Sequence, residues 1–382
     1  GHVDVGCLHV RPALDMKDPK DERLLRQISD RIAALAKQYG GVIWGEHGKG
    51  FRSEYNPLFF GEALWPVLGR IKGAFDPAGK LNPGKLAVAP GGPPLRSIDS
   101  EKRGAFDRQI PEPVRDEFSK AIDCNGNGQC FDVDADAVMC PSSKVTRSRI
   151  HSPKGRAGVM REWLRQLAVA GSDPRAEGAR RSSWFGRLWN RLRGGYDYSH
   201  EVASAMDGCL ACKACATQCP IQVDVPAFRS EFLALYHGRY PRPITDLFVA
   251  RLEGVLPLMA RLPRVSNWLS NGPIGRPLLR VLGLVDTPAL STLSLKKELH
   301  KRSVVTFSEA AFEAISGDEK GRTVLVLQDA FTSFYEPHVL LAVLDLIELL
   351  GFRPLLVPYL PSGKGSHVKG FLRRYGTDAR RW

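Results

Sequence analysis

Four cysteines within eleven residues constrain the fold of this chain more than any other feature. They stand in the stretch CLACKACATQCP, at Cys209, Cys212, Cys215 and Cys219. The chain has eight cysteines, and seven of them fall in two groups, at 124–140 and 209–219. A secreted disulfide scaffold would be shorter and would spread its cysteines more evenly. The tight spacing in a chain of 382 residues therefore predicts thiolate ligands for metal in a reducing compartment.

The spacing C-x2-C-x2-C-x3-C-P over residues 209–220 is typical of bacterial ferredoxins and predicts an iron–sulfur cluster. In that pattern three thiolates bind one cluster and the fourth reaches to a second cluster. A zinc ribbon uses two separated C-x2-C pairs instead. The first cysteine group is less regular, because Asn127 stands at the middle position of CNGNGQC and nine residues separate Cys130 from Cys140.

The ferredoxin pattern assigns the seven cysteines to two clusters. One [4Fe–4S] cluster takes four of them, namely Cys209, Cys212, Cys215 and Cys140. The remaining three leave one corner open or bound by oxygen, which suits a [3Fe–4S] cluster, and they are Cys124, Cys130 and Cys219. The alternative is that the first group is degenerate and that one cluster binds, and the sequence leaves both arrangements open. Either arrangement predicts electron transfer.

The net charge of +13 comes from 54 basic and 41 acidic residues, and five arginines lie in 180–193 alone. Because the excess is local, we do not expect nucleic-acid binding. The stretch SWFGRLWNRLR at 183–193 mixes aromatic residues with arginines, and it predicts either a membrane-surface helix or a solvated insert. No apolar run approaches the ~20 residues of a transmembrane helix. The chain starts without methionine or a signal-peptide pattern, so we expect a segment of a longer protein.

The first segment, 1–95, is expected to hold one long helix and two functional loops. Apolar residues recur at helical spacing over Asp21–Tyr39, and two glycines follow. The apolar run Val42–Trp44 predicts a short strand, so GEHGKG at 45–50 becomes a strand-end loop. The stretch FDPAGKLNPGKL at 75–86 predicts a turn-rich loop.

Three further segments follow, and we place them at 98–235, 236–315 and 316–382. The second contains both cysteine groups, a helix at 155–169 and a polar insert at 171–195. The third is rich in Leu and Pro and predicts short helices. The fourth predicts a strand at 323–331, a helix at 336–351 and a strand at 353–360, which make one βαβ unit. A lone βαβ unit cannot close its sheet, so we expect the natural chain to continue.

Three N-terminal motifs occur in an order that resembles a known family. They are GHVDVGCLH at 1–9, GEHG at 45–48 and DPAGKLNPGK at 76–85. Together they resemble the flavin-linked 2-hydroxyacid oxidoreductases, which include glycolate oxidase subunits and D-lactate and D-2-hydroxyglutarate dehydrogenases. The resemblance implies an α+β multidomain protein. Its parts are the C-terminal cap of a vanillyl-alcohol-oxidase-like flavoenzyme, an α-helical ferredoxin domain, a helical connector and the start of a cysteine-rich reductase-like α/β domain.

The resemblance also implies roles for the residues of these motifs. In metal-dependent members of the family the matching residues bind a divalent metal, zinc or manganese, and here they are His2, His9 and Glu46. The next histidine, His47, would take the hydroxyl proton while hydride passes to the flavin. Asn82 and Lys85 would lie on the FAD. Without the family pattern, a purely structural Glu46–His47 pair would be the favoured interpretation.

Two positions depart from the family pattern. Cys7 stands where the family has Asn, and Arg11 stands where it has a substrate-side Asn. Arg11 can pair with a distal carboxylate in a bidentate contact, which favours D-2-hydroxyglutarate as the substrate. On a strand, the two-residue offset from His9 would put both side chains on one face. The alternative is that Arg11 is an ordinary surface residue.

The resemblance therefore implies oxidation of a D-2-hydroxyacid. We expect D-2-hydroxyglutarate as the substrate and 2-oxoglutarate as the product. Electrons would pass from FAD through the clusters to an acceptor, which is a quinone, a flavoprotein or a cytochrome. The alternative is an iron–sulfur electron-transfer subunit without a hydroxyacid site of its own. We expect a cytoplasmic protein, with association at the inner face of the membrane left open.

Overall fold

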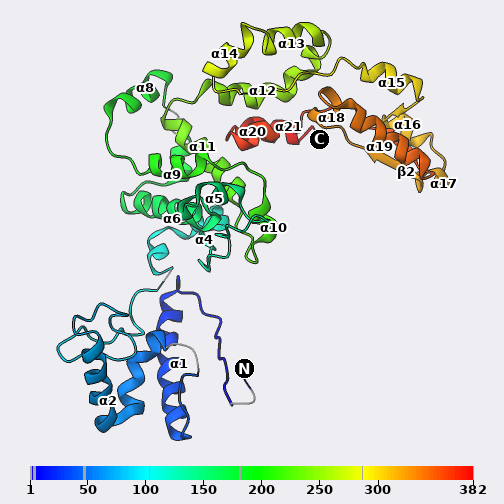
Figure 1. Ribbon diagram of the computed structural model, residues 1–382. Helices are drawn as coiled ribbons and strands as arrows, with labels where there is room; N and C mark the ends of the chain where they lie inside the picture. The colour runs from blue at the N-terminus through cyan, green and yellow to red at the C-terminus, as the bar shows by residue number, and fades with distance from the viewer. Residues whose placement is uncertain are drawn as a thin grey trace. The chain divides into compact units, whose positions relative to one another are not determined.

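The computed structural model describes residues 2, 6–45, 49–102, 104–179, 182–285 and 287–381. The chain forms two compact units, Gly1–Arg115 and Asp116–Trp382 (Figure 1). The described part is mostly helical, with one small parallel sheet near the C-terminus. This agrees with the predicted α+β class. The boundary between the two units falls later than the predicted one near 95, and the finer division into four segments stays a prediction.

Two long helices dominate the first unit (Figure 1). Helix α1, Pro19–Gln38, starts after Asp18, whose carboxylate accepts a hydrogen bond from the Lys20 N–H at 2.7 Å. It confirms the helix that the sequence predicts. Helix α2, Asn56–Phe75, follows the short helix η2, Gly50–Tyr55, and bends at Gly61, where φ is 65°. The sequence analysis did not predict α2.

The predicted strand at Val42–Trp44 is wrong. These residues form an irregular segment, and Trp44 packs on α2 instead, stacked on Phe60 with ring centroids 5.5 Å apart. Among the described residues of this unit, the pairing of His2 with Cys7 is an isolated bridge, and no strand offers a partner to residues 42–44. An apolar run without a partner strand contributes more by packing its side chains on a helix.

An ion-pair network explains why the first unit continues past residue 95. The Arg26 guanidinium on α1 contacts Glu54 at 3.0 Å and Asp99 at 2.7 Å. Arg108, on the short helix η3 (Ala105–Gln109), donates to the Met16 carbonyl and to the Glu22 carboxylate, each at 2.7 Å. These contacts attach residues 97–110 to α1, so this segment belongs to the first unit.

The core of the second unit is a group of helices around α6, Pro153–Val169, which confirms the predicted helix at 155–169. Trp163 on α6 meets Phe232 on α11, Val225–Arg239, edge to face at 5.1 Å. The surrounding elements are short and flank the cysteine groups: α3 Glu112–Glu117, α4 Ser119–Ile122, α5 Pro141–Thr146, η4 Arg149–His151, α9 Ser199–Asp207 and α10 Ala214–Gln218.

Helices form both in the insert at 171–195 and in the connector at 236–315. The sequence predicted them for the connector. The insert holds α7, Pro174–Ala179, and α8, Trp184–Arg193. The connector contains the helices α12 Ile244–Met259, α13 Pro263–Asn271, α14 Gly275–Val281 and α15 Leu295–Lys301, and the short α16, Glu309–Glu313, also falls within its predicted range. None of the helices within the described ranges has the length and apolar character needed to cross a membrane.

The predicted βαβ unit is present at the C-terminus. Strands β2, Thr323–Val326, and β3, Arg353–Leu356, are parallel, and α19, Pro337–Leu349, joins them. A third short strand, β1 at Val305–Thr306, extends the sheet in the order β1-β3-β2. Leu340 and Leu344 of α19 pack on Val326 and Leu356. The remaining elements are α17 Gly317–Lys320, α18 Ala330–Phe334, α20 Lys364–Val368 and α21 Leu372–Ala379.

Both strands are shorter than predicted. Strand β2 ends at Val326 because Asp329 caps α18, accepting hydrogen bonds from the N–H groups of Phe331 and Thr332. The sheet is joined to the helical core through α20. There the hydroxyl of Ser366 donates to the Ala250 carbonyl of α12 at 3.0 Å. The assignment of residues 316–382 to a cysteine-rich reductase-like domain stays a prediction.

Candidate functional site

The N-terminal histidines lie together in the first unit. His2 and Cys7 form an antiparallel bridge, in which the two backbone N–H groups donate to the opposite carbonyls at 2.8 and 2.9 Å. His9 follows two residues later, and its ring centroid lies 5.1 Å from that of His2. Both imidazoles are exposed. Two imidazoles this close can share one divalent cation, which is the arrangement that their predicted role requires.

The loop that carries the predicted third ligand starts beside this bridge. A Cβ built on Gly45 would lie 3.3 Å from the Cys7 sulfur, so the residue before Glu46 touches the first motif. Glu46 and His47 lie outside the described residues, and their roles as metal ligand and base stay predictions. The loop's far end is fixed by Lys49, whose ammonium lies 3.7 Å from the centroid of the Trp44 ring. Burial lowers the pKa of Lys49.

Arg11 is exposed on an irregular segment. Residues 8–15 form no strand, so the alternation that was expected to turn Arg11 toward the same side as His9 does not apply. The part of the chain described by the structure also shows no hydrogen bond or ion pair that would hold the Arg11 guanidinium elsewhere. Its role in substrate recognition stays a prediction.

The predicted flavin-side loop at 76–85 is held by hydrogen bonds at both of its ends. The buried Asp76 carboxylate accepts hydrogen bonds from the N–H groups of Lys80 and Leu81, each at 2.9 Å. Its ion pair with Lys72 at 2.6 Å is the main cause of its lowered pKa. At the other end, the fully buried Ser53 accepts from the Leu86 N–H at 2.8 Å.

The loop presents the two residues predicted to lie on the flavin. Asn82 has a left-handed backbone, with φ 46°, and its carbonyl accepts from the Lys85 N–H at 3.1 Å. Gly84 between them has φ 71°, and a Cβ there would lie 2.8 Å from the Pro94 carbonyl oxygen. The turn therefore has a fixed form, with Asn82 exposed and Lys85 half-buried at the surface.

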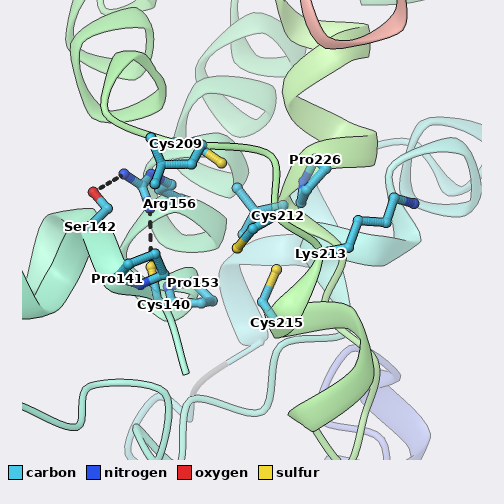
Figure 2. A pocket seen from close by; sticks show the side chains of 12 residues that line it. Cys140, Pro141, Ser142, Pro153, Arg156, Cys209, Cys212, Lys213, Cys215 and Pro226 are labelled. Atoms are coloured by element: carbon cyan, nitrogen blue, oxygen red, sulfur yellow. Dashed lines mark hydrogen bonds between the residues drawn. The ribbon is translucent and has the colours of Figure 1, made fainter. Parts of the chain in front are cut away.

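Four cysteines of the second unit surround one pocket. Figure 2 shows them with the sulfurs of Cys212 and Cys215 turned toward each other. Cys140 comes from the start of α5 and Cys209 from the loop after α9. The pocket holds about 320 Å³ of empty space, part of it open to solvent. This is the set of four that the ferredoxin pattern assigns to one cluster, and the fold brings them together from positions 69 residues apart in sequence (140 and 209).

Arg156 forms the back of this pocket and is 1% exposed. Its guanidinium donates to the Cys140 sulfur at 3.6 Å and to the Ser142 hydroxyl at 2.9 Å (Figure 2). It also donates to the Ala205 carbonyl at 2.7 Å and to the His151 carbonyl. A buried positive charge with all these acceptors fixes the thiol of Cys140 and favours negative charge in the pocket.

The other three cysteines line a second pocket. Its lining includes Cys124, Cys130 and Cys219. Asn127, at the position where the regular motif has cysteine, lines the same pocket. The Asn127 side-chain oxygen accepts from the Gln129 N–H at 3.0 Å, so it shapes the turn between the two first-group cysteines. The pocket holds about 370 Å³ of empty space. The fold thus sorts all seven clustered cysteines into the two predicted sets.

The N-terminus of α6 lies between the two pockets. Pro153, the first residue of α6, lines both of them. The next residue, Lys154, donates its backbone N–H to the Cys130 sulfur at 3.3 Å, and Arg156 reaches Cys140 on the other side. The positive end of a helix favours thiolates in both pockets. The shared wall also makes the two sites neighbours.

The donor set of each pocket fits a multi-iron cluster. Burial raises the pKa of Cys215 to about 11 and raises that of Cys130 as well. A bound cation would offset this effect because it favours the thiolates. Across the described ranges, no three His, Cys, Asp or Glu side chains lie close enough to hold a single metal ion. A zinc ion binds sulfur at about 2.3 Å and needs its thiolates in close contact. Whether the two pockets hold iron–sulfur clusters stays a prediction.

The sequence analysis missed the role of Arg229. This buried arginine on α11 donates to the Met206 carbonyl at 3.0 Å and to the Val368 carbonyl at 2.6 Å. The Cys209 N–H donates to the same Met206 carbonyl at 3.1 Å. Arg229 therefore connects the turn before the second cysteine group to the C-terminal part of the unit. Its partners are backbone atoms distant in sequence, and no local pattern indicates them.

Comparison with known proteins agrees with the N-terminal motifs. Residues 1–86 match the family of FAD linked oxidases, C-terminal domain. The match covers all three motifs that carry the resemblance and confirms the class predicted for the first segment, that of FAD-linked oxidases.

More specific similarities extend over the chain. It is similar to a D-2-hydroxyglutarate dehydrogenase of Escherichia coli (strain K12), with 51% identity over 395 residues that cover 100% of this chain and 39% of that protein. Proteins of the same name from Pantoea ananatis and Pseudomonas putida are 50% and 47% identical, cover 99% of this chain, and are themselves covered to 38% and 39%. The chain thus spans about 39% of the length of the curated relatives it matches. No solved structure matches.

Proposed function

We propose that the chain is part of an FAD- and iron–sulfur-dependent dehydrogenase that oxidises D-2-hydroxyglutarate to 2-oxoglutarate. The observation that carries this proposal is that seven cysteines line two neighbouring pockets. In the sequence they follow a segment, residues 1–86, that matches FAD-linked oxidases. Relatives named D-2-hydroxyglutarate dehydrogenase at 46–51% identity support the choice of substrate. The seven thiols suit a reducing compartment, so we also propose a cytoplasmic location.

The first unit would supply the hydroxyacid site. His2 and His9, with ring centroids 5.1 Å apart, would hold a zinc or manganese ion together with Glu46. A divalent cation held there would supply Lewis-acid activation of the substrate hydroxyl. His47 would accept the hydroxyl proton, and Arg11 would contact the distal carboxylate. Asn82 and Lys85 would face the flavin, which would supply the hydride acceptor.

The second unit would carry the electrons away. Cys140, Cys209, Cys212 and Cys215 would hold a [4Fe–4S] cluster beside Arg156. A second cluster of lower ligand count would lie in the neighbouring pocket, held by Cys124, Cys130 and Cys219. Pro153 lines both pockets, and this supports a path through two adjacent centres to a quinone, flavoprotein or cytochrome acceptor. An exposed Cys212 gives the first pocket an edge open to solvent.

Turnover by the full-length protein tests this function. Purified protein should form 2-oxoglutarate from D-2-hydroxyglutarate with an artificial electron acceptor, and it should leave the L-enantiomer unchanged. A protein that holds iron but oxidises no D-2-hydroxyacid would instead be an electron-transfer subunit, and that result would overturn the proposal.

A further inference from the structure

Helix α8 in the insert of the second unit presents its apolar residues to solvent. Trp184 is 68% exposed, Phe185 75%, Trp189 58% and Leu192 71%, and Leu188 is exposed as well. Gly186, Arg187 and Asn190 are less exposed than these apolar residues. A surface helix of a globular protein normally shows the opposite order, with its apolar side toward the core. The orientation of α8 is therefore inverted.

Hydrogen bonds hold α8 in this orientation. The Asn190 side-chain amide donates to the Arg239 carbonyl at the end of α11, at 3.0 Å. The Ser182 N–H, just before the helix, donates to the Gly238 carbonyl at 3.2 Å. Arg187 donates back to the Ser182 carbonyl at 3.1 Å. Because the polar side is attached to α11, the helix cannot turn its aromatic side inward without breaking these contacts.

Two of the three arginines of α8, Arg191 and Arg193, lie at the two edges of the apolar side. At about 100° per residue, the five apolar side chains span an arc of about 140°. Arg191 falls next to Trp184 at one edge of this arc, and Arg193 falls next to Trp189 at the other. The Arg193 guanidinium lies 5.5 Å from the centroid of the Trp189 ring. The sequence of α8 contains no acidic residue.

This layering matches the polarity of a membrane surface. Tryptophan and phenylalanine side chains prefer the boundary between headgroups and acyl chains, and arginines beside them pair with lipid phosphates. A protein partner would need a matching acidic groove, whereas an anionic lipid surface supplies negative charge along the whole helix. We propose that α8 is a membrane-surface helix that docks the protein on anionic lipid headgroups. This inference goes beyond the proposed function and does not depend on it.

Vesicle binding by the full-length protein tests this docking. We expect co-sedimentation with vesicles of phosphatidylcholine mixed with phosphatidylglycerol, and much less with phosphatidylcholine alone. The double substitution Phe185→Ser and Trp189→Ser should weaken binding roughly tenfold or more. The double substitution Arg191→Glu and Arg193→Glu should remove the preference for anionic lipid. Added salt should weaken the binding of the wild-type protein to anionic vesicles.

A matched substitution on another helix provides the control. Trp268 on α13 is 60% exposed, close to the 58% of Trp189, and α13 has a single arginine. Trp268→Ser should leave vesicle binding unchanged, and all variants should keep the iron content and thermal midpoint of the wild type. The single substitution Trp189→Ser should weaken binding. Losses from Trp189→Ser and Trp268→Ser that are equal, or a wild type that does not bind anionic vesicles, would overturn the proposal. A change of oligomeric state in the α8 variants without vesicle binding would assign this side of α8 to a second copy instead.

Discussion

The buried guanidinium of Arg156 donates a hydrogen bond to the Cys140 sulfur across 3.6 Å, from the first turn of α6 to the first residue before α5. The two residues are 16 positions apart, and the turn at Arg149–His151 folds the chain back between them. The hydrogen bond brings a fixed positive charge to Cys140, a predicted ligand in the four-cysteine pocket. Hydrogen bonds and charges near the sulfurs are main determinants of the potential of an iron–sulfur cluster.

Replacement of Arg156 should lower the reduction potential of the cluster in that pocket. Reduction adds negative charge, which the guanidinium stabilises. Loss of about 1–2 kcal/mol of this interaction in Arg156→Gln would lower a one-electron potential by roughly 40–90 mV. Arg156→Lys keeps the charge and should shift the potential less. A redox titration followed by electron paramagnetic resonance measures the shift.

Ser142→Ala serves as the control for structural damage. It removes one acceptor of Arg156, at 2.9 Å, and leaves the guanidinium beside Cys140. We expect it to lower stability by about 1 kcal/mol without moving the potential. Equal shifts in Ser142→Ala and Arg156→Gln would show that Arg156 acts through packing alone.

The substitution Glu46→Gln should release the divalent metal and abolish hydroxyacid oxidation while the flavin stays bound. A neutral amide is a far poorer ligand for a hard cation than a carboxylate. Metal analysis and flavin absorbance of the full-length variant check this. Glu62→Gln, at an exposed position of α2 in the same unit, should change neither quantity. Full metal content in Glu46→Gln would rule out the ligand role.

The substitution Arg11→Ala should lower kcat/KM on D-2-hydroxyglutarate. The loss should correspond to roughly 2–4 kcal/mol of transition-state stabilisation, the value of a lost charge-assisted contact. D-Lactate lacks a distal carboxylate, so its turnover should change far less. Arg11→Lys should restore part of the loss, since a point charge cannot reproduce the planar fork. Similar losses on both substrates, or none on either, would show that Arg11 does not bind the distal carboxylate.

The free energy of unfolding of the second unit should vary with pH through the protonation of Glu231 on α11. Burial raises its pKa to about 7 from an ordinary 4.5, so the folded state keeps a proton that the unfolded state has lost between these pH values. Stability contributed by this group is full below about pH 4.5 and declines as the pH rises to about 7. Glu231→Gln should therefore stabilise the protein by about 1–3 kcal/mol at pH 8 and by little at pH 4.

Urea unfolding at the two pH values measures this difference. Glu348→Gln, at an exposed position of α19, should be close to neutral at both. A stabilisation from Glu231→Gln that is the same at pH 4 and pH 8 would mean that the carboxyl group is not held protonated by the fold.

Local patterns predicted the parts of the fold that depend on local interactions. Helix α1 follows from its apolar spacing and from the cap at Asp18. Helix α2 was missed because Gly61 and Pro66 interrupt its pattern, and the chain absorbs the interruption as a bend at Gly61. The strand expected at Val42–Trp44 failed because a strand depends on a partner, and Trp44 packs on Phe60 instead.

The grouping of the cysteines into two pockets agrees with their spacing in the sequence, and their role as cluster ligands stays a prediction. Spacing does not indicate the contacts of Arg156, whose acceptors include backbone carbonyls at His151 and Ala205. Backbone acceptors leave no mark on the sequence, so their geometry comes only from the fold. The inverted side of α8 likewise depends on Asn190 meeting the end of α11, which composition alone does not indicate.

The central claim is that electrons from the hydroxyacid reach clusters held by two separate sets of cysteines. Anaerobic electron paramagnetic resonance of the full-length protein, before and after addition of D-2-hydroxyglutarate, tests it directly. The account predicts a reduced-cluster signal that the substrate induces. Cys212→Ser should abolish one cluster signal, Cys124→Ser should affect only a second and weaker one, and Cys7→Ser, outside both pockets, should leave both signals intact. Loss of all iron in Cys124→Ser, or a spectrum that the substrate leaves unchanged, would contradict the account.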